Sequence, residues 1–189
     1  MKTKMLILTA LFAALTAVGA FIRIPFLYSA ITLQIFFTAL AGVLLGARYG
    51  ALSQLVYVAL GLLGLPIFTA GGGIGYLFQP TCGFLLGLIP TAWVIGKLTE
   101  RSHSLRRIML AVLAGYAVLY LIGMPYMALI LNVYMGKGLS LWALLMAGMI
   151  PFLPGDALKI IVVGVLTPQL LPHLRPMLAC TAANTAEPV

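Results

Sequence analysis

Apolar residues in this chain form long, nearly unbroken runs, and the short segments between the runs carry most of the polar and charged residues. An α-helix rises about 1.5 Å per residue, so a run of about 17 to 25 apolar residues is long enough to cross the roughly 30 Å hydrocarbon core of a bilayer. The pattern therefore predicts six membrane-spanning helices, at residues 5–22, 32–46, 49–63, 80–98, 108–131 and 154–171.

Three segments depart from this simple pattern. The run at 32–46 is short for a span, so it requires local thinning of the bilayer or a changed tilt. Gly123 and Pro125 should kink the run at 108–131, because proline removes a helical hydrogen bond. The apolar segment 140–149 is too short to span comfortably and is predicted to be re-entrant or interfacial.

The composition agrees with lipid as the solvent of this chain. Hydrophobic residues make up 63% and charged residues only 7%, with a mean hydropathy of +1.15, whereas an ordinary soluble domain is about 25% charged. Too few charged side chains are present to cover a soluble core of this size. The expected fold class is an all-α membrane protein, with six transmembrane helices in one bundle over residues 1–172. The polar segment 173–189 is expected to be a disordered cytoplasmic tail.

The first apolar run has a second interpretation. Basic residues within 1–4 precede it and small residues at 14–20 could form a cleavage site, as in a secretory signal peptide. Because apolar runs of the same kind follow it as far as residue 172, we interpret it as a retained first helix.

The net charge of +8 is distributed as a topology signal. The cations occur singly or in short clusters between the apolar runs, so no nucleic-acid partner is expected. With a cytoplasmic N-terminus, the inner side carries most of the 11 Lys and Arg residues, namely Lys2, Lys4, Arg48, Lys97, Arg101, Arg106, Arg107 and Arg175. The outer loops carry Arg23 and Lys137. By the positive-inside rule, both termini are expected in the cytoplasm and the chain in a bacterial cytoplasmic membrane.

Asp156 and Lys159 are the charged residues that fall inside a predicted span rather than at its end, and a charge at the centre of a span costs about 2.5 to 3.5 kcal/mol on insertion scales. They follow a Pro154-Gly155 break, and their spacing puts both on one face of a helix. One interpretation is a helix cap at Asp156 with Lys159 partly neutralising it. A lysine in the first turn faces the positive end of the helix dipole, however. This position favours an anionic or carbonyl-bearing ligand as the partner of Lys159.

A glycine-rich outer loop without charge, at 64–76, is the second unusual feature. It could be a flexible connection between spans. In the functional interpretation, Gly72 and Gly73 let the backbone approach a ligand closely. The apolar walls and an amide of that site would come from Phe68, Tyr76, Phe78 and Gln79. No Gly-Lys-Ser/Thr follows, so the loop is not a phosphate loop and ATP hydrolysis by this chain is not expected.

The first helix and the loop after it supply two further candidates. Ala10 and Ala14 stand four apart on one stripe, and small residues at this spacing let another helix approach closely. Packing inside the bundle is the alternative role for this stripe. Arg23, Phe26 and Tyr28 follow in the outer loop and are candidates for a lid over the site.

Taken in order, several motifs resemble the BioY family, the biotin-binding S components of energy-coupling factor (ECF) transporters. The motifs are GARYGALS at 46–53, Tyr57, LGLLGLPIF at 60–68, the glycine triplet at 71–73, PTCGF at 80–84 and PGDALK at 154–159. The resemblance runs from about residue 5 to residue 172. Cys82 and Phe84 stand where the family often has glycine and tyrosine, which removes a phenol from this chain.

The resemblance implies a six-helix membrane fold with an outward pocket for biotin. It also implies that the helix bearing Ala10 and Ala14 docks on an ECF transmembrane coupling subunit, which two ATPase subunits power. Biotin has a ureido group, an apolar body and a carboxylate. Asp156 can accept from the ureido N–H groups, and Lys159 can meet either the carboxylate or the ureido oxygen. Phe84 is expected among the apolar contacts, and neither a cofactor nor a metal is expected.

The residues alone also allow other functions. The chain could bind another small vitamin-like anion, or it could be a channel or an assembly subunit without a ligand. An intramembrane enzyme would need a nucleophile and base, or a metal cluster, at membrane depth. His103 and His173 both fall on the cytoplasmic side, and no predicted span contains a glutamate.

Overall fold

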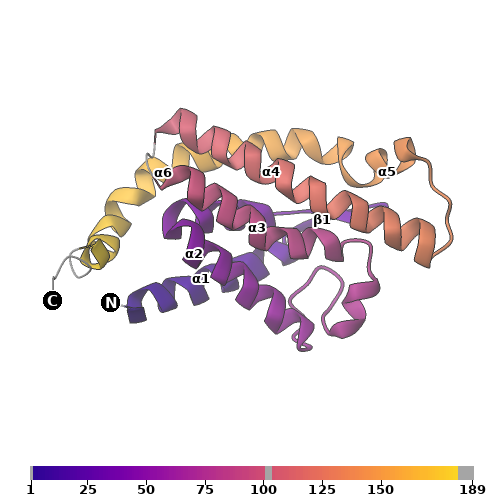
Figure 1. The fold of residues 1–189 in the computed structure, drawn as a ribbon, viewed down its shortest axis with the longest axis horizontal. Coiled ribbons are helices and arrows are strands. Elements are labelled where there is room, and N and C mark those ends of the chain that lie inside the picture. Colours follow the sequence, from indigo (N-terminus) through magenta and orange to yellow (C-terminus); the bar gives the residue numbers. More distant parts are fainter. Residues whose placement is uncertain (1, 101–103, 183–189) are drawn as a thin grey trace.

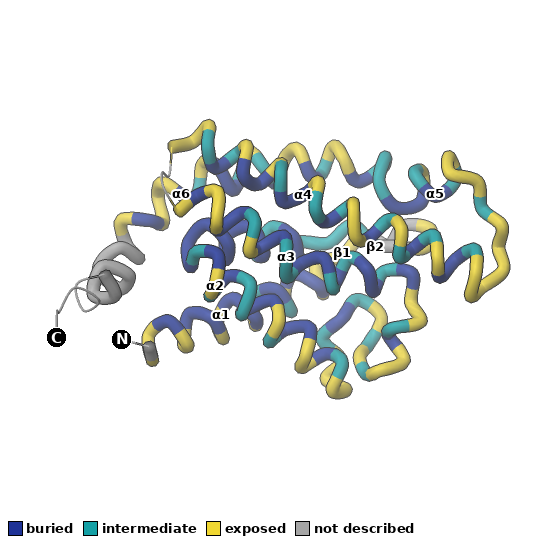
Figure 2. The backbone as a smooth tube through the Cα atoms, viewed as in Figure 1, coloured by how far each residue is buried: buried dark blue, intermediate teal, exposed yellow. Residues whose placement is uncertain are grey.

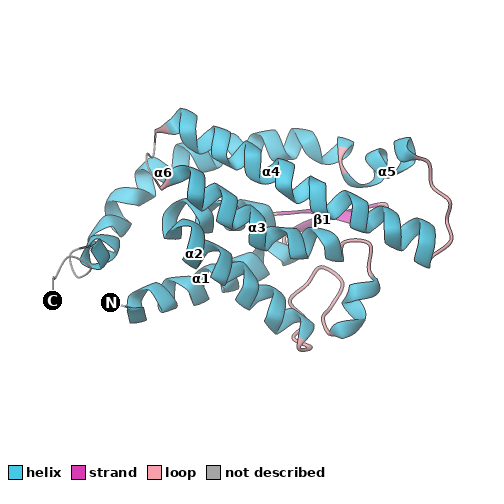
Figure 3. Cartoon of the chain, in the orientation of Figure 1, coloured by secondary structure: helices cyan, strands magenta, loops and turns pink. Residues whose placement is uncertain are grey.

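The computed structural model describes residues 2–100 and 104–182, apart from the side chains of Lys2, Pro25, Phe26, Ser29 and residues 173–182. The described chain is mainly helical (Figure 3). Its α-helices are α1 (Lys2–Phe21), α2 (Gln34–Leu62), α3 (Cys82–Thr99), α4 (Leu105–Ala128), α5 (Leu141–Gly148) and α6 (Leu153–Ala182). The shorter elements are the strands β1 (Arg23–Phe26) and β2 (Ser29–Thr32), the 3-10 helices η1 (Ile74–Phe78) and η3 (Ile150–Phe152), and the π-helix η2 (Leu129–Tyr134).

The helices lie side by side in an elongated bundle (Figure 1). Within the described ranges, five helical segments are long and apolar enough to cross a membrane: Thr3–Phe21, Gln34–Leu62, Cys82–Thr99, Leu105–Tyr134 and Leu141–Pro172. The beginning of α1 and the end of α6 lie at one end of the bundle. The β-hairpin, the glycine-rich loop and the α4–α5 connection lie toward the other end. The predicted helical membrane fold is therefore confirmed.

Exposed residues recur along the helices of the bundle (Figure 2), and many of them are large and apolar. Leu6, Ile7, Leu113, Leu121 and Ile161 are each more than half exposed. A soluble protein rarely exposes so much contiguous apolar surface, whereas a bilayer solvates it. The outer surface of these helices is thus a lipid-facing surface.

Helix α2 consists of two helical arms that meet at Gly46, where the backbone leaves the helical region (φ 78°, ψ 178°). A positive φ of this size suits glycine, which has no Cβ. The arms run antiparallel, because Thr38 Oγ1 donates to Gln54 Oε1 at 2.9 Å and Gln34 Nε2 donates to Tyr57 Oη at 2.8 Å. The two spans predicted at 32–46 and 49–63 correspond to these arms.

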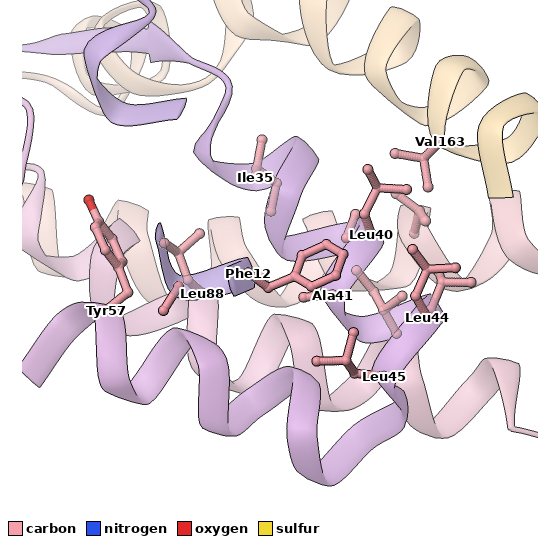
Figure 4. Close-up of a cluster of buried hydrophobic side chains, with 14 of the residues drawn as sticks. Phe12, Ile35, Leu40, Ala41, Leu44, Leu45, Tyr57, Leu88 and Val163 are labelled. Carbon is pink, nitrogen blue, oxygen red and sulfur yellow. The ribbon is translucent and has the colours of Figure 1, made fainter. Parts of the chain in front are cut away.

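The helices approach each other closely where glycines face a neighbouring backbone. A Cβ built on Gly96 of α3 would lie 2.3 Å from the nitrogen of Ala47 and 2.5 Å from the carbonyl carbon of Gly46. Helix α3 therefore passes directly against the turn between the two arms of α2. Phe12, Leu40 and Leu44 belong to the buried apolar core of the bundle (Figure 4).

A buried polar cluster joins α1 to both arms of α2. The Gln54 side chain is fully buried, and its amide nitrogen donates to Thr16 Oγ1 at 3.2 Å and to Ser53 Oγ at 3.0 Å. Its amide oxygen accepts from Thr38. Polar groups in an apolar interior are stable only when they are hydrogen-bonded. The cluster therefore fixes the orientation of α1 on α2.

The loop after α1 differs from the purely helical prediction. Residues 23–32 form an antiparallel β-hairpin, in which Arg23 pairs with Thr32 and Phe26 with Ser29. Its turn contains Leu27, at a φ of 39°. Each strand has only four residues, too few to give a recognisable alternation between two apolar runs. The pairing satisfies backbone groups at the end of the bundle, where they would otherwise lack partners.

The later helices also differ in detail from the prediction. At Gly123 and Pro125, where a kink was predicted in the helix at 108–131, α4 continues as far as Ala128 and then passes into the π-helix η2. The segment predicted at 140–149 forms the separate short helix α5, capped by the Ser140 hydroxyl. Helix α6 continues to Ala182, past the end predicted at residue 171. The division of the chain at residue 172 stays a prediction.

Candidate functional site

A cavity of about 80 Å³ lies inside the bundle between α2, α3, α4 and α6. This volume is enough for several water molecules or one small ligand. Its lining residues are Ala30, Thr32, Gln34, Ile35, Thr69, Tyr76, Thr81, Phe84, Leu85, Leu88, Tyr116, Leu119, Tyr120, Gly148, Phe152, Asp156 and Lys159. Elements from both halves of the chain therefore build one site.

The charged side of the cavity comes from α6 and α4. Lys159 Nζ donates to Asp156 Oδ1 at 3.0 Å, and the Tyr120 hydroxyl donates to Asp156 Oδ2 at 2.5 Å. Asp156 and Lys159 are buried, so this ion pair lies in a medium of low dielectric where unpaired charges would be costly. Each carboxylate oxygen has one donor and retains capacity for another.

Asp156 is not the helix cap that the sequence allowed. Helix α6 begins at Leu153, so Asp156 lies in the first turn, and its carboxylate contacts Tyr120 and Lys159. The negative charge still faces the positive end of the helix dipole, which stabilises it there. The predicted placement of the acid and the base on one helix face is confirmed by their 3.0 Å contact.

Tyr116 lies one helical turn before Tyr120 on the same face of α4. Its side chain is only 4% exposed, and its ring centroid lies 6.5 Å from that of Tyr120. The buried Tyr116 hydroxyl has no hydrogen-bond partner among the residues that the structure describes. Buried polar groups are nearly always paired, so this unpaired hydroxyl requires an explanation.

Neutral polar groups from α2, β2 and the segment before α3 also line the cavity. Gln34 donates to Tyr57 at 2.8 Å, and its amide oxygen accepts from Thr32 at 3.0 Å. The Tyr76 hydroxyl lies 2.8 Å from Thr69 Oγ1 and 3.0 Å from Thr81 Oγ1. These groups can donate and accept hydrogen bonds without adding net charge.

Apolar side chains form the remaining walls. Phe84 packs its ring edge-on against Tyr120, with centroids 6.2 Å apart. Ile35, Leu88 and Leu119 are further apolar lining residues. A mostly apolar cavity with a few polar groups suits a small molecule that has an apolar body and polar groups at separate positions.

The structure brings four of the eight predicted binding residues to this cavity, namely Asp156, Lys159, Tyr76 and Phe84. Phe68 lies behind the wall, 2% exposed, with its ring 5.5 Å from Tyr57 and 4.7 Å from Tyr76. It supports Tyr76 from outside the cavity. Gly72, Gly73 and Gln79 are not among the lining residues.

The glycines have a packing role in the loop. Phe68 and Gly71 pair their backbones, and Gly73 N donates to Gly61 O at 2.7 Å. A Cβ on Gly72 would lie 2.1 Å from the carbonyl oxygen of Leu65. The expected flexible or ligand-facing loop is thus folded back on the end of α2, since its backbone hydrogen bonds are made within the protein.

The predicted lid residues lie in the β-hairpin. Ala30 and Thr32 of its second strand line the cavity. The Lys137 ammonium lies 4.0 Å from the centroid of the Tyr28 ring, a cation–π contact that ties the hairpin to the α4–α5 connection. Arg23 is exposed, and the side chain of Phe26 lies outside the described residues.

The predicted docking residues lie on the outside of the bundle. Ala10 and Ala14 are exposed, whereas the neighbouring Ala13 is buried at 5% exposure. The alternative of packing inside the bundle therefore does not apply to Ala10 and Ala14. The stripe is available to another helix.

Several lining residues were not identified from the sequence, most importantly Tyr116, Tyr120 and Gln34. The two tyrosines carried a usable signal, because they stand four apart in an otherwise apolar run and so share a helix face. Gln34 lies at the beginning of a predicted span, where polar residues are common and indicate little. Which of these groups share a cavity depends on tertiary packing.

Comparison with known proteins gives consistent matches over nearly the whole chain. The sequence model of the BioY family matches residues 1–176. A probable biotin transporter BioY of Lysinibacillus sphaericus is 44% identical over 157 residues, which cover 82% of this chain and 80% of that protein. The biotin transporter BioY of Thermotoga maritima is 36% identical over 171 residues, which cover 88% of this chain and 95% of that protein.

A solved structure matches the fold as well. It is described as a crystal structure at 2.1 Å of the S-component for biotin from an ECF-type ABC transporter. The TM-score is 0.77 at 27% sequence identity, and the match covers 89% of this chain and 91% of that chain.

Proposed function

The chain belongs to the BioY family, and from this premise we propose that it is the biotin-binding membrane component of an ECF-type transporter. It takes up biotin and is a transporter subunit rather than an enzyme, with no cofactor of its own. The observation that supports this proposal most directly is the buried Asp156–Lys159 pair in the wall of a mostly apolar cavity.

The polar lining groups of the cavity match the polar groups of biotin. The Asp156 carboxylate accepts hydrogen bonds from the ureido N–H groups, and Lys159 contacts either the ureido oxygen or the carboxylate. Phe84 and the neighbouring aliphatic residues contact the apolar rings and chain. Tyr76 and Gln34 supply neutral hydrogen bonds. Because water is excluded, these few polar contacts orient the ligand strongly.

The proposed orientation places both termini in the cytoplasm, with six crossings. Each arm of α2 crosses the bilayer once, and the turn at Gly46 lies on the inner side with Arg48. The beginning of α1 and the end of α6 lie at the same end of the bundle, which supports this arrangement. Lys137 lies on the outer side, in agreement with the positive-inside rule. The host membrane is then the bacterial cytoplasmic membrane.

The β-hairpin is the proposed outer cover of the site. Its strand β2 lines the cavity through Ala30 and Thr32, so movement of this segment would widen the access to the site. Arg23, Phe26 and Tyr28 belong to this cover. The Tyr28–Lys137 contact is exposed and therefore weak enough to break during entry.

Calorimetry on the purified protein tests the proposed function. Biotin should bind saturably with one molecule per chain, and nicotinate, a small vitamin anion without a ureido group, should not bind. Mass spectrometry of the protein purified from its host should identify biotin as the retained ligand. Absence of biotin binding, or retention of a different vitamin, would contradict the proposal.

Helix α1 is the proposed docking surface for the ECF transmembrane coupling subunit, which two ATPase subunits energise. Replacing Ala14 with leucine should impair docking because it places a bulky side chain between two closely packed helices. Overpacking of this kind costs about 1–3 kcal/mol, which is about a 5- to 150-fold loss of docking affinity. Co-purification of the assembled transporter measures the loss of docking, and biotin uptake in cells measures its effect on transport.

Ala117→Leu is the matched control for this substitution, since Ala117 is also exposed but lies on α4. Both variants should bind biotin as the unchanged protein does, and only Ala14→Leu should lose its partners. Equal co-purification of the coupling subunit with the two variants would contradict the assignment of α1 as the docking surface.

A further inference from the structure

Tyr116 lines the cavity, and its hydroxyl is the one buried side-chain polar atom without a hydrogen-bond partner within the described ranges. It lies among groups that are otherwise paired: Tyr120 and Lys159 already donate to the two oxygens of Asp156. We infer that the Tyr116 hydroxyl donates a hydrogen bond to the ureido oxygen of bound biotin and helps to determine ligand specificity. The inference rests on the proposed function and extends it to a named ligand atom.

Burial makes this hydroxyl costly in the empty protein. Tyr116 is only 4% exposed, so bulk water cannot supply the hydrogen bond that its hydroxyl lacks. A phenylalanine would fill the same space without that cost. A phenol at this position is therefore explained if its hydrogen bond forms only when a ligand is present.

The chemistry of the surrounding groups selects the ligand atom. The ureido group presents two N–H donors and one oxygen acceptor within a small rigid ring. Asp156 offers acceptor capacity toward the N–H groups. Tyr116 lines the same cavity one helical turn before Tyr120, which bonds Asp156, and offers a donor toward the oxygen. A ligand carboxylate has acceptors alone and would meet the negative charge of Asp156. The ureido group therefore fits this side of the cavity better.

The substitution Tyr116→Phe separates a ligand contact from a structural role. The thermal midpoint of the empty protein in detergent should stay unchanged or rise, because an unpaired buried hydroxyl is removed. Biotin affinity, measured by calorimetry, should fall about 10- to 100-fold, the range expected for one hydrogen bond in a buried polar network. A lower midpoint with unchanged affinity would overturn the inference, since it would mean that the hydroxyl serves the fold.

Tyr120→Phe is the matched control, because its hydroxyl is already bonded to Asp156. This variant should lower both the thermal midpoint and the biotin affinity. The inference requires that both substitutions weaken biotin binding and that only Tyr120→Phe lowers the thermal midpoint. Equal destabilisation by both substitutions would contradict it.

Two ligand analogues identify the contacted atom. In 2-thiobiotin a sulfur, which is a weak acceptor, replaces the ureido oxygen, so the affinity ratio between unchanged and Tyr116→Phe protein should shrink to less than about threefold. Biotinamide lacks the charged carboxylate and should retain the full ratio. A full affinity ratio with 2-thiobiotin together with a reduced ratio for biotinamide would overturn the assignment to the ureido oxygen. If the unchanged protein failed to bind biotin at all, the proposed function itself would fail, which is a separate result.

Discussion

Replacement of Asp156 with alanine should lower biotin affinity by about 10²- to 10³-fold, the largest effect expected in the cavity. The variant loses the acceptor for the ureido N–H groups, and it leaves the buried Lys159 ammonium without its counter-charge. Removing one partner of a buried ion pair typically costs about 3–5 kcal/mol, and about 1.4 kcal/mol corresponds to tenfold in affinity. Calorimetry with biotin measures the loss directly. The thermal midpoint of the empty protein should fall as well.

The chain contains a matched control for this substitution. Lys97 and Glu100 form an ion pair with the same three-residue spacing and the same 3.0 Å separation, but their side chains are 60% and 43% exposed. An exposed pair contributes little because water and salt screen it. Glu100→Ala should therefore leave biotin affinity and thermal midpoint nearly unchanged. Asp156→Asn, which keeps one acceptor oxygen, should fall between the two.

Replacement of Gly96 with valine should have the largest effect on stability. A Cβ at this position would lie 2.3 Å from the nitrogen of Ala47, and backbone atoms cannot move aside as a flexible side chain can. Overpacking in a rigid interior costs about 1–3 kcal/mol and sometimes more, so α3 should separate from the turn at Gly46. We expect a clearly lower thermal midpoint in detergent and a lower yield of folded protein.

Gly75→Val serves as the comparison, because a Cβ on Gly75 meets nothing within 4 Å. Its thermal midpoint should match that of the unchanged protein. If Gly96→Val proved equally stable, the close contact between α3 and the α2 turn would not be a determinant of the fold.

The sequence was informative wherever the bilayer constrains it. Apolar length located the helices, because each span must satisfy its backbone internally and present apolar side chains to lipid. The same constraint singled out Asp156 and Lys159, since charges inside a span are rare and costly. The structure places these two side chains in contact at 3.0 Å in the cavity wall.

The rest of the site depends on contacts between segments distant in sequence. Tyr120 reaches Asp156 across 36 positions of the chain, and nothing local to either residue specifies this contact. Glycines in the loop before α3 indicated close backbone approach correctly, but the approaching group is the protein's own backbone at Leu65 rather than a ligand. The four-residue strands of the hairpin were too short for their pattern to be distinguished from a loop.

The placement of both charges on one helix has an electrical consequence. Asp156 and Lys159 are three residues apart on α6, so any rotation or displacement of that helix carries a positive and a negative charge together. Moving a single elementary charge through the field of a bilayer involves about 2.3 kcal/mol per 100 mV. For the neutral pair these contributions nearly cancel. Movement of α6 within the bilayer would therefore involve little electrical work from this pair, whereas an unpaired charge at either position would couple that movement to the membrane potential.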